Sequence, residues 1–376
     1  MELTTLFSSK KIGNVNIKNR LVRSATLEGL CEKYGYISSR FIKFHEQLAS
    51  GGIGLIITGA VAVDPSGSGG PYQARIDNKS YEEGHKKLTE SVHNILDTKI
   101  GIQLIHTGRQ GLHPKYHPVA PSAVFFPITK LTPRALDTNE IDDYIKMFVQ
   151  ASVRAYECGY DMVQYHASHG YLLSNFLSPY TNKRDDKYGG SIGNNVRFII
   201  NIYNQTRDQL GKEFPLIIKS QVNDFIPGGL DYENGIRIIE KLIEVGFNGI
   251  EPSGGIGETP LFTKEAYPSR FIRKPEDENY FLSFAKKVKP IMKNCALILV
   301  GGIKNPLVAE EILKNKWADF ISLSRPLIRE PNLPNRWKEG DLNPAKCISC
   351  NSCLETMGTG LYCVIKRRFE EETKKE

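Results

Sequence analysis

Eight short apolar segments recur along the chain, separated by stretches whose apolar residues follow helical spacing. The segments that favour β-strands are Arg20–Ala25, Ile53–Gly59, Lys99–Ile105, Met162–His166, Pro215–Gln221, Gly249–Ser253, Leu297–Gly301 and Phe320–Leu323. Strands that are apolar on both faces and alternate with helices are typical of a parallel sheet. Eight such units over about 300 residues predict an α/β fold of the (β/α)8 TIM barrel type rather than an open sheet.

The segments between these strands complete the predicted architecture. Amphipathic helices are predicted at Phe41–Ala49, Lys86–Leu96, Glu140–Glu157, Asn194–Leu210, Tyr232–Val245, Glu278–Val288 and Pro306–Lys314. Residues Lys11–Asn19 alternate around a Gly-Asn turn, which favours a hairpin that caps one end of the barrel. The long connections Val61–Tyr81 and Gly108–Thr138 are expected to shape an active site. We therefore predict a barrel domain over residues 1–340 and a short Cys-rich extension over 341–376, whose charged end from Lys366 is expected to fray.

Several predicted strands end in residues suited to a flat, electron-accepting ligand. Strand one ends in Ser24, Ala25 and Thr26, and Ala60 follows strand two, so the backbone could approach a ring closely. Gln103 interrupts an apolar strand, where its amide either bridges backbone groups or pairs with the donor–acceptor edge of a heterocycle.

A lysine and the last two strand ends extend this pattern. Lys219 either forms an ion pair with Asp161 or Glu251 or places a positive charge beside a ligand that gains electrons. The last two strands lead into Gly301-Gly302 and Ser324-Arg325. Loops after these strands form the usual phosphate site of phosphate-binding barrels. Together the strand ends would suit flavin mononucleotide (FMN) lying across the barrel mouth.

Two histidines and a tyrosine follow strand four within six residues: His166, His169 and Tyr171. The C-terminal end of a barrel strand is where catalytic groups of this fold lie. A His-x-x-His pattern by itself is more often structural, so its interpretation depends on what the other strand ends carry.

Composition and charge narrow the class of protein. With 40% hydrophobic and 24% charged residues among 376, the chain resembles an ordinary globular protein. A net charge of +7 without a dense basic block predicts no nucleic-acid partner. Apolar runs such as Gly52–Ala62 are too short to span a bilayer, and Met1–Thr4 lacks the features of a secretory signal. We expect a cytoplasmic protein with no membrane partner.

Four of the seven cysteines are clustered near the end of the chain: Cys347, Cys350, Cys353 and Cys363. Their spacings of two, two and nine residues could hold a [4Fe–4S] cluster or, less favoured, a zinc ion. Reduced thiols without a metal remain the alternative. The scattered cysteines Cys31, Cys158 and Cys295 are interpreted as buried core thiols.

The ordered motifs resemble the old yellow enzyme family of FMN-dependent NADH:flavin oxidoreductases and ene-reductases over residues 5–335. The resemblance rests on Lys18–Arg20, Gly59-Ala60, Gln103–Arg109, the His166/His169/Tyr171 segment, Arg184 with Tyr188–Ser191, Arg197, Gly301-Gly302 and Arg325–Leu327. It implies that backbone groups at Ser24, Ala25, Thr26 and Ala60 contact the flavin. It further implies that Gln103 binds the pyrimidine edge and that Gly301, Gly302, Ser324 and Arg325 hold the phosphate.

Two positions depart from the family pattern. Lys219 stands where the family usually has arginine, which keeps the charge and loses the fork geometry. Leu27 stands where a threonine or cysteine often tunes the flavin.

The resemblance also implies a mechanism. NAD(P)H would reduce the flavin, and an α,β-unsaturated carbonyl compound would then bind in the same place. His166 and His169 would polarise its oxygen, flavin N5 would deliver hydride to the β-carbon, and Tyr171 would protonate the α-carbon.

The cysteine cluster resembles that of the 2,4-dienoyl-CoA reductase and trimethylamine dehydrogenase branch. In that branch the second and last spacings are wider, and further nucleotide-binding domains follow that these 376 residues do not include. An electron-donor protein and a homo-oligomer are therefore left open as partners.

Three alternatives remain at this stage. An FMN enzyme of the same design could oxidise an amine or reduce a nitro or disulfide acceptor. An FMN/Fe-S electron-transfer subunit could exchange electrons through the cysteines without NAD(P)H. A non-flavin barrel such as an aldolase could use Lys219 as a Schiff-base lysine.

Overall fold

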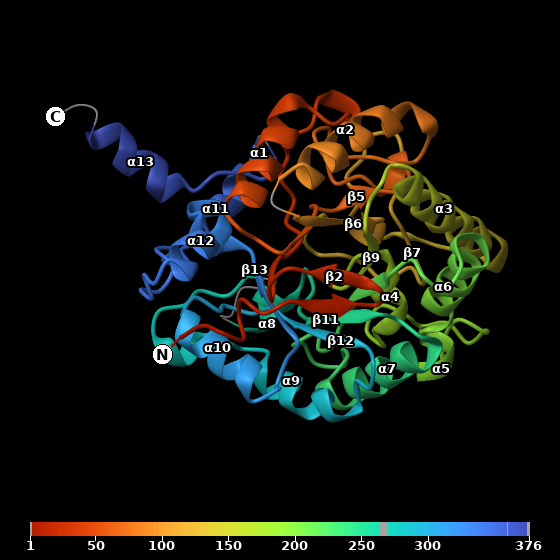
Figure 1. Ribbon diagram of the computed structural model, residues 1–376. Helices are drawn as coiled ribbons and strands as arrows, with labels where there is room; N and C mark the ends of the chain where they lie inside the picture. Colours follow the sequence, from red (N-terminus) through yellow and green to blue (C-terminus); the bar gives the residue numbers. More distant parts are fainter. Residues whose placement is uncertain (1, 96, 264–268, 359, 374–376) are drawn as a thin grey trace.

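The predicted barrel is closed in the structure, a computed structural model that describes residues 2–95, 97–263, 269–358 and 360–373 (Figure 1). Its eight parallel strands are β3 (Leu21–Arg23), β4 (Leu55–Ile57), β6 (Lys99–Ile105), β9 (Met162–Ala167), β10 (Leu216–Gln221), β11 (Gly249–Ser253), β12 (Ala296–Leu299) and β13 (Phe320–Leu323). Each strand pairs with the next, and β13 pairs with β3 to close the ring. This confirms the predicted (β/α)8 fold.

Helices connect successive strands and surround the barrel (Figure 1). They are α1 (Ser39–Ser50), α2 (Glu82–His93), α3 (Thr138–Glu157), α6 (Arg197–Leu210), α7 (Tyr232–Val245), α9 (Leu282–Val288), α10 (Pro306–Lys314), α11 (Arg325–Arg329) and α12 (Leu333–Lys338). The helix predicted from Lys86 begins earlier, with two glutamates in its first turn, and its predicted end at Leu96 lies outside the described residues. The helix predicted from Glu278 begins only at Leu282, because Asn279 lies in the left-handed region with φ +57° and interrupts helical backbone.

The long connections contain short elements of their own. These are β5 (Val61–Ala62), β7 (Val119–Ala120), β8 (Arg134–Ala135), α4 (Leu172–Leu177), α5 (Ile192–Asn195) and α8 (Thr259–Phe262). Single 3₁₀ turns lie at Lys33–Gly35, Pro65–Gly67, Lys79–Tyr81, Gly108–Gln110, Pro275–Asp277, Lys289–Ile291 and Ser352–Thr356. The two segments predicted as plain loops, 61–81 and 108–138, are thus partly ordered by strand pairing with β6 and between β7 and β8.

The predicted N-terminal hairpin is present as β1 (Lys10–Ile12) and β2 (Val15–Ile17). Its two isoleucines are fully buried and belong to one cluster with inward-facing residues of the barrel strands, such as Val22, Leu55 and Ile217. The hairpin therefore closes the N-terminal end of the barrel with apolar side chains. That leaves the opposite end of the barrel available for chemistry.

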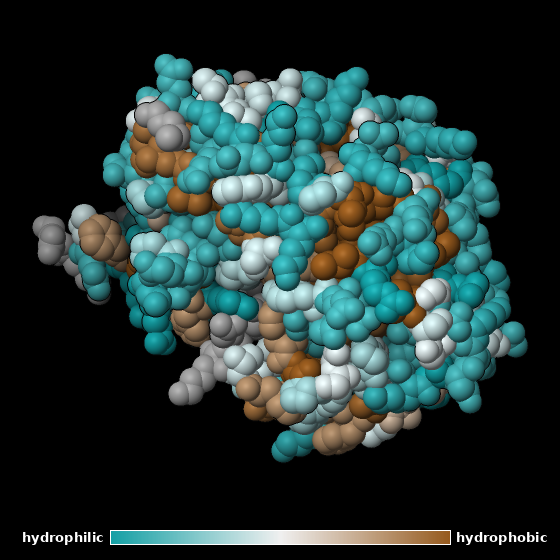
Figure 2. All heavy atoms as spheres, turned by 90° about the horizontal axis from the view of Figure 1, so that it is seen from below, coloured by the Kyte–Doolittle hydropathy of each residue, from teal (hydrophilic) through white to brown (hydrophobic). Residues whose placement is uncertain are grey.

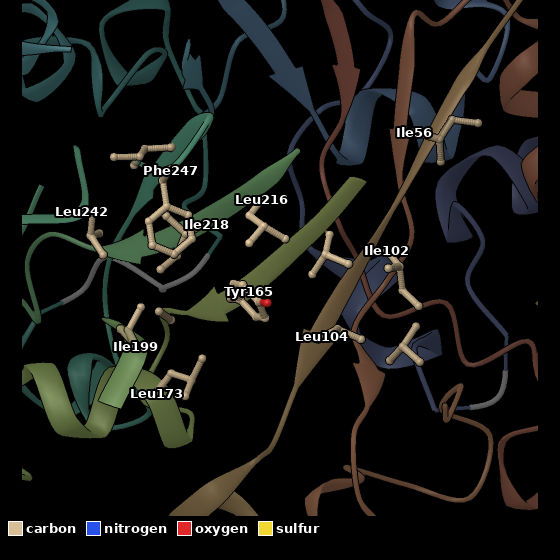
Figure 3. Close-up of a cluster of buried hydrophobic side chains, with 14 of the residues drawn as sticks. Ile56, Ile102, Leu104, Tyr165, Leu173, Ile199, Leu216, Ile218, Leu242 and Phe247 are labelled. Atoms are coloured by element: carbon tan, nitrogen blue, oxygen red, sulfur yellow. The ribbon is translucent and has the colours of Figure 1, made fainter. Parts of the chain in front are cut away.

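Alternate residues of each strand point outward and pack against the helices. Figure 3 shows Ile102, Leu104, Tyr165, Leu216 and Ile218 among the buried side chains of this outer core. Tyr165 is the polar member of the set, and its hydroxyl lies 2.9 Å from Ser152 Oγ in α3 and 2.9 Å from Thr206 Oγ1 in α6. The residues between these outward positions, including Gln103 and Lys219, therefore face the barrel interior.

The chain beyond residue 340 lies against the barrel and ends in a projecting helix, α13 (Val364–Thr373) (Figure 1). Leu361 N–H donates to the Glu28 carbonyl at 2.7 Å, and Ala345 N–H donates to the Lys304 carbonyl at 2.9 Å. The tail expected to fray is helical as far as Thr373. It carries an i,i+4 ion pair between Arg367 and Glu371 at 2.9 Å.

The exterior is mainly polar. On the face seen in Figure 2, hydrophilic residues predominate around a hydrophobic area near the centre. Among the described residues, no helix combines the length and apolarity needed to cross a bilayer.

Candidate active site

The C-terminal ends of the barrel strands surround a cavity of about 310 Å³, here named the mouth cavity. Its wall brings together nearly all of the side chains that the sequence predicted for the site. They are Ser24, Ala25, Thr26, Ala60, Gln103, His166, His169, Tyr171, Lys219, Gly302, Ser324 and Arg325. Gly301 precedes Gly302 and does not line the cavity. Leu27 also lies in the wall.

A polar network beneath the mouth cavity is centred on Glu251, whose side chain is fully buried. One carboxylate oxygen accepts from Ser24 Oγ at 2.8 Å and Ser322 Oγ at 2.9 Å, and it lies 3.2 Å from Lys219 Nζ. The other oxygen accepts from Gln164 Nε2 at 3.0 Å. Lys219 thus forms the ion pair with Glu251 that was one of its two predicted roles, and it also lines the cavity, as the other role requires.

This network fixes the orientation of the Gln103 amide. A carboxylate only accepts hydrogen bonds, so the Gln164 side chain must donate to Glu251 with its nitrogen. Its oxygen then accepts from Gln103 Nε2 at 2.7 Å. Gln103 is left with its carbonyl oxygen as an acceptor and one further N–H as a donor. That pair complements the N–H/C=O edge of a pyrimidine ring.

The predicted phosphate end depends on two glycines in the left-handed region of φ. Gly301 has φ +128° and Gly302 has φ +78°. A Cβ at Gly302 would lie 2.9 Å from Ile272 Cδ1, so a side chain there is both strained and crowded. Arg325 lines the same end, and its Nη1 already donates to Asn351 Oδ1 at 2.6 Å and to the Arg270 carbonyl at 2.7 Å. A phosphate clamp by Arg325 would therefore use its other guanidinium nitrogens.

The histidine–tyrosine group gathers at one side of the mouth cavity. The His166 ring centroid lies 5.0 Å from that of His169 and 5.0 Å from that of Tyr171. Ser168 N–H donates to His166 Nδ1 at 3.3 Å, which leaves the proton on Nε2 as a donor. His169 has φ +65°, and its Nε2 lies 2.7 Å from Ser253 Oγ. If Ser253 donates in that contact, His169 carries its proton on Nδ1.

Burial sets the protonation of all three groups. Desolvation, helped by the positive charge of Lys219, lowers the pKa of His166 and His169 well below the ordinary value. Their mutual interaction lowers the pKa of His166 further. Desolvation raises the pKa of the Tyr171 phenol. At neutral pH the site therefore holds two uncharged imidazoles and a protonated phenol, all able to donate hydrogen bonds.

The four clustered cysteines line a second, much smaller cavity of about 20 Å³, here named the cysteine cavity. Arg325 and Arg329 also line it, and Arg329 Nη1 lies 3.7 Å from Cys363 Sγ. Within the described part of the chain, no three His, Cys, Asp or Glu side chains stand close enough together to hold a single metal ion. Cys353 and Arg325 line both the cysteine cavity and the mouth cavity.

Sequence reasoning missed the buried pair Arg23 and Glu28 behind the first strand. Burial lowers the pKa of Arg23 to about 10 and raises that of Glu28 to about 7. Arg23 Nη1 donates to Thr26 Oγ1 at 2.7 Å, and Gly59 N–H donates to Glu28 Oε1 at 3.1 Å. An arginine inside an otherwise apolar strand was the available signal. The wall residues Leu354, Met357 and Leu361 of the extension were also missed, and no local pattern marks them.

The fold and this cavity define a class of protein, the phosphate-binding barrels that can hold a flavin over the strand ends. The sequence profile of the family described as NADH:flavin oxidoreductase / NADH oxidase matches residues 5–343. The chain belongs to this family. Membership confirms the predicted old yellow enzyme resemblance and the prediction of an FMN-dependent oxidoreductase.

Individual relatives agree with this assignment. An NADH oxidase from Thermoanaerobacter brockii is 38% identical over 351 residues, covering 92% of this chain and 52% of that protein. An NADPH dehydrogenase from Bacillus velezensis is 34% identical over 330 residues, covering 87% and 92%. The solved complex of 2-naphthoyl-CoA reductase with 2-naphthoyl-CoA has a TM-score of 0.89 at 28% identity, covering 98% of this chain and 58% of that one. A single-residue mutant of morphinone reductase in complex with tetrahydroNAD has a TM-score of 0.74 at 26% identity, covering 90% of this chain and 92% of that one.

These relatives fall into two size groups. The chain spans about half the length of the NADH oxidase and of 2-naphthoyl-CoA reductase. It spans nearly the whole of the NADPH dehydrogenase and of morphinone reductase.

Proposed function

We propose that this chain binds FMN in the mouth cavity and reduces the activated C=C bond of an α,β-unsaturated carbonyl compound, with NAD(P)H as reductant. One observation carries the proposal: two neutral histidines and a protonated tyrosine line the same cavity as the groups suited to a flavin. The relatives include an NADPH dehydrogenase and 2-naphthoyl-CoA reductase, whose names support a reduction of this general kind.

The residues present fit FMN. The Gln103 amide offers an acceptor and a donor for the pyrimidine edge, and Lys219 offers a positive charge on the same side. Ser24, Ala25, Thr26 and Ala60 give a wall of small residues along which a ring can lie. The glycine turn at Gly302, with Ser324 and Arg325, is suited to the phosphate. When bound, the flavin supplies hydride acceptance and donation.

The chain's own groups then handle the substrate oxygen and the proton. His166 Nε2–H and a proton on His169 Nδ1 would donate to the carbonyl oxygen and stabilise negative charge that develops there. Their depressed pKa values keep them neutral, so they act as hydrogen-bond donors and not as cations. Tyr171 holds its proton at neutral pH and would pass it to the α-carbon.

The test separates the two halves of the reaction. In Tyr171→Phe, stopped-flow reduction of the flavin by NAD(P)H should keep its rate, because the phenol takes no part in it. Reoxidation by cyclohexenone should slow by about 10²–10⁴-fold, the usual contribution of a general acid. Tyr156→Phe, on the exposed face of α3, is the matched control. Unchanged reoxidation in Tyr171→Phe would remove Tyr171 from this role.

For the cysteines we infer a [4Fe–4S] cluster held by Cys347, Cys350, Cys353 and Cys363. Support comes from the fact that all four cysteines line one cavity and lie within seventeen residues of the sequence. The wall position of Cys353 in both cavities favours the second candidate function, in which electrons reach or leave the flavin through the cluster and a partner protein.

Anaerobic purification tests the cluster directly. Broad absorbance at about 400 nm beneath the flavin bands, with acid-labile sulfide, is expected. Cys353→Ser should lose iron, whereas Cys295→Ser, at a buried thiol of the barrel, should keep it. If the protein contains zinc and no acid-labile sulfide, the four thiols hold a zinc ion and not an iron–sulfur cluster. Protein that is colourless after flavin removal and free of both metals would refute a metal at these thiols.

A further inference from the structure

A third cavity of about 300 Å³ lies beside the mouth cavity, outside the proposed flavin, substrate and cysteine sites. We name it the outer cavity. It is lined by Tyr34, Pro65, Ser68, Gly69, Gly70, Pro71, Arg75, Leu112, His113 and Pro114. Its size falls within the range of about 300–1,000 Å³ typical of small-molecule sites.

The outer cavity is continuous in its walls with the substrate side of the mouth cavity. Gly69 lines both. The segment that supplies Thr107 and Gln110 to the mouth cavity continues directly into Leu112 and His113 of the outer cavity. Gln110 Nε2 in turn donates to the His169 carbonyl at 2.7 Å. The two cavities therefore share a wall at Gly69 and along the segment around Gln110.

The chemistry of the outer wall is apolar. Tyr34 and Leu112, which both line it, expose 62% and 67% of their surface, so this cavity presents open apolar surface. Arg75 is the one charged residue among the described lining residues. Its guanidinium is engaged by Asp77, with Nε 2.7 Å and Nη2 3.0 Å from the two carboxylate oxygens. The charge of Arg75 is thus already compensated by Asp77, which disfavours the phosphates of NAD(P)H as the occupant of this cavity.

The walls are anchored through the backbone. Tyr34 N–H donates to the Pro71 carbonyl at 2.8 Å, Arg75 N–H donates to the Gly35 carbonyl at 3.2 Å, and Tyr81 Oη donates to the Tyr34 carbonyl at 3.0 Å. The cavity is therefore a preformed feature between two tied segments.

We propose that the outer cavity receives the apolar alkyl or aryl part of an extended substrate whose unsaturated carbonyl group lies at His166 and His169. The proposal rests on the proposed function and adds a substrate class to it: enones or enals with a long apolar substituent, in preference to small cyclic ones.

The experiment uses the complete FMN-loaded protein and a series of 3-alken-2-ones of increasing chain length, with cyclohexenone as the short reference. In the oxidised protein without NAD(P)H, each Kd is measured from the perturbation of the flavin spectrum. Each methylene that enters the cavity should tighten binding roughly fourfold until the cavity is filled. The Kd of cyclohexenone should not depend on the outer cavity, because this short compound does not reach it.

We expect Gly70→Phe to fill the cavity, because Gly70 lines it and a Cβ at this position meets no heavy atom within 4 Å. The dependence of Kd on chain length should be abolished, while the Kd of cyclohexenone changes less than twofold. Gly193→Phe, where a Cβ likewise meets nothing within 4 Å, is the matched control in α5. Leu112→Ser removes an apolar wall residue without adding bulk and should weaken the binding of the long enones only. It takes the place of Gly70→Phe if that variant does not fold.

An unchanged chain-length dependence in both variants overturns the proposal. So does slower flavin reduction by NAD(P)H in Gly70→Phe with all enones unaffected, which would assign the cavity to the nucleotide. Because binding is read without turnover, the outcome stands apart from the proposed reaction: enones that bind but are never reduced would refute the ene-reductase function alone.

Discussion

Replacing Glu251 by glutamine removes the one buried charge that compensates Lys219 while keeping the shape of the side chain. Lys219 is 4% exposed and Glu251 0%, so both charges are largely withdrawn from solvent. After the change, Nζ keeps Ser24 Oγ at 2.9 Å as a neutral partner. Leaving one member of a buried pair uncompensated costs roughly 3–5 kcal/mol. The donors Ser322 and Gln164 would also face an amide with one acceptor oxygen in place of two.

A double-variant cycle isolates the pair from these other losses. Glu251→Gln and Lys219→Met should each lower the free energy of unfolding by about 3–5 kcal/mol. The double variant should lose less than the sum by about 2–3 kcal/mol, since no charge is left unpaired. Urea unfolding, followed by circular dichroism with and without saturating FMN, measures the free energy of unfolding of the unsubstituted protein, the two single variants and the double variant. Strictly additive losses would show that the 3.2 Å contact carries no coupling and would refute the reasoning.

Two further predictions concern the phosphate turn and the pH range of stability. Gly302→Ala should weaken FMN binding at least tenfold. The control is Gly340→Ala, where φ is +98° and a Cβ meets no heavy atom within 4 Å; it should carry a comparable backbone strain of about 1–2 kcal/mol and leave the FMN Kd unchanged. Equal FMN Kd values in the two variants would contradict a phosphate role for the turn. Desolvation lowers the pKa of three buried histidines to about 4, those of His45, His85 and His106. Their unfolded forms bind protons first as the pH falls below about 6.5, so the contribution of these histidines to stability is complete above that pH and declines toward pH 4. The opposite effect of Glu28, whose raised pKa of about 7 favours the folded state at low pH, leaves a net decline on the order of 2–3 kcal/mol per pH unit. Urea midpoints at pH 7, 6 and 5 test this, and a midpoint that rises on acidification would contradict it.

The barrel was predictable because each of its eight strands carries its own signal. A run such as Leu216–Gln221 is apolar on both faces, and only a strand with helices outside and a packed interior needs that. The His166 to Tyr171 group was predictable for the same reason, since all its members lie in one local segment at a strand end. The exact bounds shifted by a few residues, as at α2, which begins at Glu82, and at α9, which begins at Leu282.

The polar network could be anticipated only in part, because it depends on register between strands. Lys219 stands opposite Glu251 on β11 and opposite His166 on β9, and Gln103 stands opposite Gln164. Sequence reasoning placed Lys219 and Gln103 correctly in the interior but left two acidic partners open. In the structure Asp161 is instead 2.8 Å from His93 Nε2 on the exterior. The choice between the two carboxylates follows from barrel closure, which no single segment encodes.

The C-terminal extension changes how the two cavities should be understood. Cys353 lines the cysteine cavity and the mouth cavity, and Leu354 and Met357, just beyond it, form part of the mouth wall. Arg325 ties the same wall to the extension through Asn351 and the Ser349 carbonyl, while facing the predicted phosphate end. A group held by the cysteines would therefore be separated from a bound flavin by little more than the side chains of Cys353 and Arg325. Because the same short segment lines both cavities, we expect a group held by the thiols to change the shape of the mouth cavity, and a ligand in the mouth cavity to change the surroundings of the thiols.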